Sequence, residues 1–193
     1  TTVQDKMRES VSVKDFGAVG DGVTNDTDAF AAASAYITAQ DGGRLVIPAG
    51  TYIVGKQTFA GATRRGYSYQ GATILKIENC TKPVVIEAQG ATLELAAGRK
   101  YGSFDPVTGA VYNPAMPFYG NGYRADVGSM MFFQNNANVL ITGVCELDGN
   151  SANAVLGGTW GDTGRQLVSY GLIAYENLQF QAENIHTHHH CLD

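Results

Sequence analysis

The stretch VSVKDFGAVGDGVTNDTDAFAAASAYITAQDGGRLVIPAGTYIV, residues 11–54, decides the fold of this chain. It begins with Val11 and Val13 alternating with polar residues, which is the period of a half-buried strand. The glycines that follow, from Gly17 to Gly22, predict tight turns. A short strand is therefore expected to lead into a glycine loop.

A capped helix is expected after this loop. Residues 25–27 read Asn-Asp-Thr, all of which favour a helix N-cap, and Asp28 adds a negative charge in the first turn, where the helix dipole favours it. A mostly apolar stripe continues to about residue 39, and two glycines at 42–43 end the helix. Short buried strands are then expected at residues 45–47 and 52–54, joined by a Pro-Ala-Gly turn.

These motifs resemble the N-terminal signature of the pectate-lyase-like superfamily. KDFGAVGDGVTNDTDAF (residues 14–30) and GGRLVIPAGTYIV (residues 42–54) occur in the order of that signature. The resemblance implies an all-β fold, a single-stranded right-handed parallel β-helix with an N-terminal capping helix. The lead-in TTVQDKMRESVSVKDFGA (residues 1–18) resembles the start of the β-helix in bacteriophage tailspikes and tail-fibre depolymerases.

The remainder of the chain predicts the rungs of such a solenoid. Short segments of alternating polarity, such as 84–86 and 92–95, are separated by turn residues, and Gly90 between these two is expected to mark a rung corner. The expected organisation is a lead-in at 1–10, a cap module at 11–54 and rungs at 55–193, with loop insertions at about 99–128 and 151–169. An uncapped β-helix exposes strand edges, so the rungs are expected to continue beyond residue 193.

Composition narrows the class of protein. The 193 residues are 44% hydrophobic and 16% charged, with 24 glycines, which favours one turn-rich β domain. A net charge of -5 argues against nucleic acid as the main partner, because phosphate binding needs a basic face. The three cysteines are odd in number and far apart, which favours buried free thiols; they are Cys80, Cys145 and Cys191.

No apolar run in the chain has the length of a signal peptide or of a membrane span. No membrane insertion is therefore expected. This pattern favours a protein made in a bacterial cytoplasm and released by lysis, and the tailspike resemblance implies that its final location is the virion tail.

Carboxylates are the first candidate catalytic groups. Cleavage of a glycosidic bond commonly uses a paired acid and base, which a parallel sheet can present from neighbouring rungs about 4.8 Å apart. Candidates in the laddered half are Glu146, Asp148, Asp162, Glu176, Glu183 and Asp193. Asp162 and Glu183 are taken as catalytic candidates, whereas Asp148, in an LDGN sequence, is expected to shape a turn.

Asp193 is the third catalytic candidate. The segment IHTHHHCLD, residues 185–193, resembles the rung of polygalacturonase-like β-helices in which an Asn-Thr-Asp motif presents a catalytic aspartate. In this chain Cys191 and Leu192 precede the aspartate, which departs from that motif.

Four histidines near the end of the sequence form a second group. On one strand, His186, His188 and His190 would share a face, and alternating histidines can chelate a transition metal. Because no acidic or cysteine ligand stands nearby at a familiar spacing, neither a metal nor another cofactor is expected. His188 is instead a candidate general base.

Aromatic residues of the two insertions form a third group. Sugar rings stack on flat side chains with polar tips, and arginine binds uronic carboxylates in a bidentate manner. The candidate substrate-binding residues are Tyr112, Tyr119, Tyr123, Arg124, Trp160 and Arg165. Phe104 and Phe118 are expected to pack the loop against the solenoid.

Together these patterns favour a phage tailspike depolymerase that binds and cleaves a bacterial surface polysaccharide, capsule or O-antigen, by hydrolysis or β-elimination. By resemblance such tailspikes are homotrimers, and other phage tail proteins would be further partners. Two alternatives stay open: a non-enzymatic glycan-binding or structural tail or adhesin β-helix, and a secreted bacterial pectate lyase or polygalacturonase.

Overall fold

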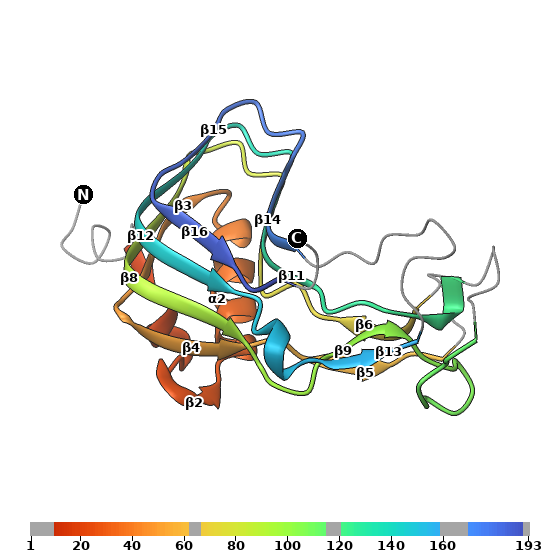
Figure 1. Cartoon of the computed structure of the whole chain (residues 1–193). Helices are drawn as coiled ribbons and strands as arrows, with labels where there is room; N and C mark the ends of the chain where they lie inside the picture. The colour runs from red at the N-terminus through yellow and green to blue at the C-terminus, as the bar shows by residue number, and fades with distance from the viewer. Residues whose placement is uncertain (1–9, 62–66, 115–120, 159–169, 191–193) are drawn as a thin grey trace, which may run out of the picture.

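The structure is a computed structural model that describes residues 10–61, 67–114, 121–158 and 170–190 (Figure 1). Its strands form three sheets in which most neighbouring strands run parallel. Within these residues, no helix is both long and apolar enough to cross a membrane.

The elements are as follows. Sheet A contains β1 (Ser10–Ser12), β2 (Asp21–Asn25), β3 (Gly43–Ile47), β4 (Gly50–Val54), β8 (Val84–Leu95), β12 (Val139–Asp148), β15 (Phe180–Ala182) and β16 (Ile185–His188). Sheet B contains β5 (Gln57–Phe59), β6 (Tyr67–Gly71), β9 (Lys100–Ser103), β10 (Arg124–Ala125) and β13 (Val155–Gly157). Sheet C contains β7 (Leu75–Glu78), β11 (Ser129–Gln134) and β14 (Tyr170–Tyr175). The helices are η1 (Val13–Phe16), α2 (Thr27–Ala39), η2 (Asn121–Tyr123) and η3 (Ser151–Asn153).

The chain visits the sheets in a repeating order, and each circuit is a rung. β7, β8 and β9 belong to sheets C, A and B in turn, and β11, β12 and β13 repeat that order in the next rung. Helix α2 precedes strands β3 and β4 of sheet A and packs against β7, so it takes the place of a sheet C strand in the first rung. The prediction of a parallel β-helix with an N-terminal helix is confirmed.

The core lies inside the coil, where side chains of successive rungs stack. Leu45, Ile86 and Ile141 are in register on β3, β8 and β12, and all three are fully buried. Each such side chain contributes about 1.5–3 kcal/mol when it leaves water. At the N-terminal end, Phe30 of α2 packs edge-on against Tyr52 of β4, with ring centroids 5.3 Å apart. The helix thereby joins the same hydrophobic core as the rungs.

The start of α2 is held by the residues that the sequence indicates, but in a different way. The N-cap residue Asp26 does not cap the helix with its side chain. Its carboxylate accepts the backbone N–H groups of Val19 and Gly20, at 2.7 and 3.0 Å. Asn25 Oδ1 accepts the N–H and the hydroxyl of Thr27. Asp26 therefore fastens the glycine loop to the helix start.

Two sequence expectations need correction. Gly90 does not separate two strands, because β8 runs continuously through it and only the register with β12 shifts there. The insertion at 99–128 is not simply a loop, because β9, β10 and η2 fall within it and the two strands join sheet B. Sheet B extends to the right of the coil in Figure 1. Phe104 packs as expected and is 1% exposed, whereas Phe118 lies outside the described residues.

The expectation of buried free thiols holds for Cys80 and Cys145, both free and buried. Cys191 and residues 1–9 of the lead-in lie outside the described residues.

Candidate functional site

The outer face of sheet A carries acidic and histidine side chains in two neighbouring columns. In one column Glu146 of β12 stands between Thr92 of β8 and His186 of β16. In the next, Asp148 stands between Glu94 and His188. Neighbouring strands of a sheet are about 4.8 Å apart, so these groups lie side by side. We call Glu94, Glu146, Asp148, His186, His188 and His189 the acid–histidine face.

Glu146 is the most accessible carboxylate of this face. Its residue is exposed, and its Oε2 accepts the Thr92 hydroxyl at 3.1 Å. Within the described ranges, no lysine or arginine forms an ion pair with any carboxylate of the acid–histidine face. Glu146 is therefore available to a substrate lying across the sheet.

Asp148 ends β12 and shapes the turn after it, as the sequence predicts. Its Oδ1 accepts the backbone N–H of Asn150 at 2.8 Å. The Asn150 amide in turn donates to Glu94 Oε1 at 3.0 Å and to Leu95 O at 2.8 Å. Hydrogen bonds to two successive rungs thus fix the Asp148 carboxylate in one orientation.

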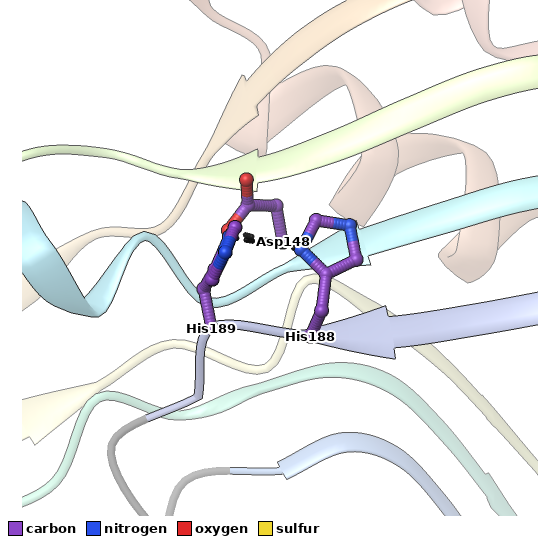
Figure 2. Close-up of side chains that lie close together, drawn as sticks. All are labelled: Asp148, His188 and His189. Carbon is purple, nitrogen blue, oxygen red and sulfur yellow. Dashed lines mark hydrogen bonds and ion pairs between the residues drawn. The ribbon is translucent and has the colours of Figure 1, made fainter.

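Two imidazoles meet this carboxylate (Figure 2). His188 is the last residue of β16, and His189 follows it with a left-handed backbone, φ 52°. The Nδ1 atoms of the two histidines are 2.9 Å apart, and His189 Nδ1 lies 3.1 Å from Asp148 Oδ1. His188 Nδ1 lies 3.8 Å from the same oxygen. One carboxylate oxygen and two imidazole nitrogens therefore converge, and this group could hold a metal ion.

The histidines do not all share one face. Because β16 ends at His188 and His189 is left-handed, the strand alternation stops before His190. The Nε2–H of His190 donates to Leu147 O at 3.1 Å. The expectation that His186, His188 and His190 share a face therefore does not extend to His190.

The predicted catalytic residues are distributed unevenly. His188 belongs to the acid–histidine face. Glu183 lies between β15 and β16, where its Oε1 accepts the Gln181 amide at 2.8 Å, away from the Asp148 cluster. Asp162 and Asp193 lie outside the described residues. Their catalytic roles, and that of Glu183, stay predictions.

Among the predicted sugar-binding residues, Tyr112 and Tyr123 pack against each other, with ring centroids 4.4 Å apart. Arg124 lies over the Tyr67 ring, with its guanidinium carbon 5.1 Å from the ring centroid. All three residues are half-buried, so part of each side chain is covered by protein. Tyr119, Trp160 and Arg165 lie outside the described residues.

Arg99 was not anticipated from the sequence. Its Nη1 donates to Gly55 O at 3.3 Å, and burial lowers the pKa of its guanidinium. Within the part of the chain that the structure describes, Arg99 forms no ion pair. The backbone of Gly98 bonds to Asn153 in η3, so Arg99 lies beside the turn that follows Asp148.

A separate hollow of about 180 Å³ lies beside sheet C and is lined by Thr73, Asp126, Gly128, Ser129, Phe132 and Ile173. Burial raises the pKa of Asp126, and its Oδ1 accepts the Gly128 N–H. Asp126 is the single carboxyl of this lining. The acid–histidine face, with several acid and base groups together, is the better candidate site.

The stacked parallel rungs define a parallel β-helix that carries acid and histidine groups on one outer face. The chain belongs to the rhamnogalacturonase A/epimerase, pectate lyase-like family, whose model matches residues 10–113. No curated protein matches the chain.

Two solved structures are similar to it, both A-modules of mannuronan C-5 epimerases from Azotobacter vinelandii. AlgE6 has a TM-score of 0.47 and 21% identity, over 91% of this chain and 44% of that one. AlgE4 has a TM-score of 0.46 and 21% identity, over 92% of this chain and 41% of that one. The chain thus spans less than half of the length of these structures.

Proposed function

We propose that this β-helix binds a bacterial surface polysaccharide and cleaves it on the acid–histidine face, by hydrolysis or β-elimination. The observation that carries the proposal is the register of Glu146, Asp148, His186 and His188 on the outer face of adjacent rungs. We further propose that the protein is a homotrimeric phage tailspike, located in the virion tail. The resemblance of residues 1–18 to tailspike lead-ins supports this more specific proposal.

Glu146 has a role in either reaction. In hydrolysis, Glu146 is the general acid or base, and Asp148 is the next carboxylate of the same outer face, with its Cα about 6.6 Å further along β12. An inverting hydrolase needs about 6.5–9.5 Å between its two carboxyl groups, which leaves room for an attacking water. In β-elimination, His186 or Glu146 removes the C5 proton next to the uronic carboxylate. The C4–C5 double bond then forms as the C4–O bond breaks, and water or a protonated group of the same face gives a proton to the leaving oxygen.

The proposal is tested by incubating the protein with purified capsule and O-antigen polysaccharides from a panel of bacteria. Products are followed by new reducing ends and by ultraviolet absorbance of unsaturated uronic acids. Proton exchange at C5 is followed as well, because the family includes epimerases. Reducing ends without absorbance identify a hydrolase, and absorbance identifies a lyase. Proton exchange without chain cleavage overturns depolymerisation in favour of epimerisation.

A binding measurement distinguishes an enzyme from a β-helix that only recognises a glycan. The same polysaccharides are tested for binding by calorimetry. A polysaccharide that binds at this chain without any chemical change contradicts the enzymatic proposal and favours a glycan-binding tail β-helix.

A further inference from the structure

We infer that Asp148, His188 and His189 form a binding site for one divalent transition metal ion of the zinc class. The ligand atoms are Asp148 Oδ1 and the Nδ1 atoms of the two histidines. This inference does not rest on the proposed function, because it concerns binding alone.

The geometry fits a small tetrahedral ion. The three ligand atoms are separated by 2.9, 3.1 and 3.8 Å. Zinc binds imidazole nitrogen and carboxylate oxygen at about 2.0–2.2 Å, so two tetrahedral ligands are about 3.3–3.6 Å apart. The observed separations lie around this value, and shifts of a few tenths of an ångström bring all three atoms to it.

Hydrogen bonding alone leaves the cluster incompletely satisfied. His189 Nδ1 carries either one hydrogen or one lone pair, yet it lies within bonding distance of both His188 Nδ1 and Asp148 Oδ1. A hydrogen on this atom is shared between the two acceptors, and a lone pair faces the carboxylate oxygen. A metal cation bonds to the lone pairs of all three atoms at once.

Hydrogen bonds hold the Asp148 carboxylate in the orientation that a metal ligand needs. Asp148 Oδ1 is oriented by the Asn150 N–H, and Asn150 is held by Glu94 and Leu95 of the preceding rung. Partners that orient metal ligands in this way commonly change metal affinity by about 10–100-fold when they are removed. Asp148 is therefore held by its own rung and the preceding one, and β16 brings the two histidines from the next rung.

The donor set selects the kind of ion. Two imidazole nitrogens and one carboxylate oxygen suit zinc, cobalt or nickel, whereas calcium takes six to eight oxygen ligands. The side chains of His188 and His189 are 37% and 68% exposed. Three protein ligands with solvent access leave a coordination position open for water or a substrate oxygen, as in catalytic rather than structural zinc sites.

The test is a titration of the tag-free, chelator-treated chain with Zn²⁺ by calorimetry and with Co²⁺ by visible absorption. One ion per chain and a tetrahedral Co²⁺ spectrum are expected. Asp148→Asn and His189→Gln should each weaken binding at least about tenfold. Asn at 148 keeps an oxygen to accept the Asn150 N–H, so the turn is retained, and circular dichroism checks the fold of each variant.

His186→Gln is the matched control, because it removes an imidazole of the same strand that does not contact the three ligand atoms. Its affinity should equal that of the parent chain. Equal weakening in all variants, or several ions bound per chain, would show adventitious binding by the histidine-rich segment and overturn the inference. Absence of binding would overturn it too, and polysaccharide activity has no bearing on either outcome.

Discussion

Asn136 links three rungs of the coil through one buried side chain. It is 1% exposed, and its amide donates to Ile77 O at 3.1 Å and to Asn177 Oδ1 at 2.9 Å. Its own Oδ1 accepts the Cys80 N–H at 3.0 Å. The turns between sheets C and A are therefore held together from inside, where water cannot substitute for a lost partner.

We predict that Asn136→Ala lowers the free energy of unfolding by about 2–5 kcal/mol, because it leaves buried donors and acceptors unpaired. For a domain of this size, each kcal/mol lowers the melting temperature by about 2–4 °C. Thermal unfolding measures the change. Asn138→Ala removes a more exposed bond to Gln179 and should cost less than about 1 kcal/mol. Equal losses in the two variants would contradict the role of Asn136.

Cys145 is a thiol that the fold keeps neutral. It is fully buried in the core, and burial raises its pKa from 9.0 to about 12. Because the folded state disfavours the thiolate, the stability that the neutral thiol contributes is present below about pH 9 and is lost as pH rises toward 12.

Alkylation at pH 8 should therefore spare Cys145 in the folded chain. The thiolate population alone makes its reaction about a thousandfold slower than in the urea-unfolded chain. Peptide mass spectrometry at several reaction times gives the rate for each cysteine separately. Similar rates for Cys145 in the folded and unfolded chains would contradict its burial.

At this scale the sequence predicts residue types better than residue contacts. It indicates correctly that Asp148 shapes a turn and that Phe104 packs. It does not show that Asp148 also meets His189, because the two residues are distant in sequence and only strand pairing brings them together. The expectation of no metal rested on the lack of a nearby acidic ligand, and the adjacent rung places one beside the histidines.

Among the elements, β12 joins the rungs on its two sides, because it pairs with β8 on one side and with β15 and β16 on the other. It pairs with β8 along its whole length, and Gly143 allows a close approach at its middle. Gly143 has φ 85°, and a Cβ there would lie 1.8 Å from Ala88 O. Gly90 has nearly the same backbone, φ 84°, but a Cβ there would meet nothing within 4 Å.

This pair of glycines permits a matched test. Gly90→Ala should cost about 1–2 kcal/mol, the strain of a left-handed residue with a Cβ. Gly143→Ala carries the same strain and also forces β12 away from β8, which adds about 1–3 kcal/mol. In denaturant unfolding, the free energy of unfolding of Gly143→Ala should be clearly lower than that of Gly90→Ala. Equal stabilities would contradict the close approach of the two strands.

The cap module is the element that the sequence predicts best. The helix ends at Ala39, and strands β3 and β4 contain the residues expected at 45–47 and 52–54. Its signals are local: N-cap residues, glycine turns and apolar periods. The insertion at 99–128 is predicted poorly, because its strands form only by pairing with sheet B residues that are distant in sequence.

Across the whole molecule, the register between rungs explains why the candidate site was only partly anticipated. Paired residues are 41 positions apart for Gly43 and Val84, 55 for Val84 and Val139, and 41 for Val139 and Phe180. Because the insertion lengthens the middle rung, the sequence shows no constant repeat from which columns of side chains could be aligned. Glu94 and Glu146 therefore joined the histidines only in the structure.

The acid–histidine face is the part of the molecule that we propose to process a polysaccharide. The most direct measurement is the initial rate of the parent chain, Glu146→Gln and Glu87→Gln on the polysaccharide that the panel identifies. Glu87 lies elsewhere on sheet A and forms an ion pair with Arg44, so it controls for the same chemical change. Loss of a general acid or base should slow Glu146→Gln by about 10²–10⁴-fold, while Glu87→Gln keeps the parent rate. A Glu146→Gln variant as fast as the parent chain would contradict the account.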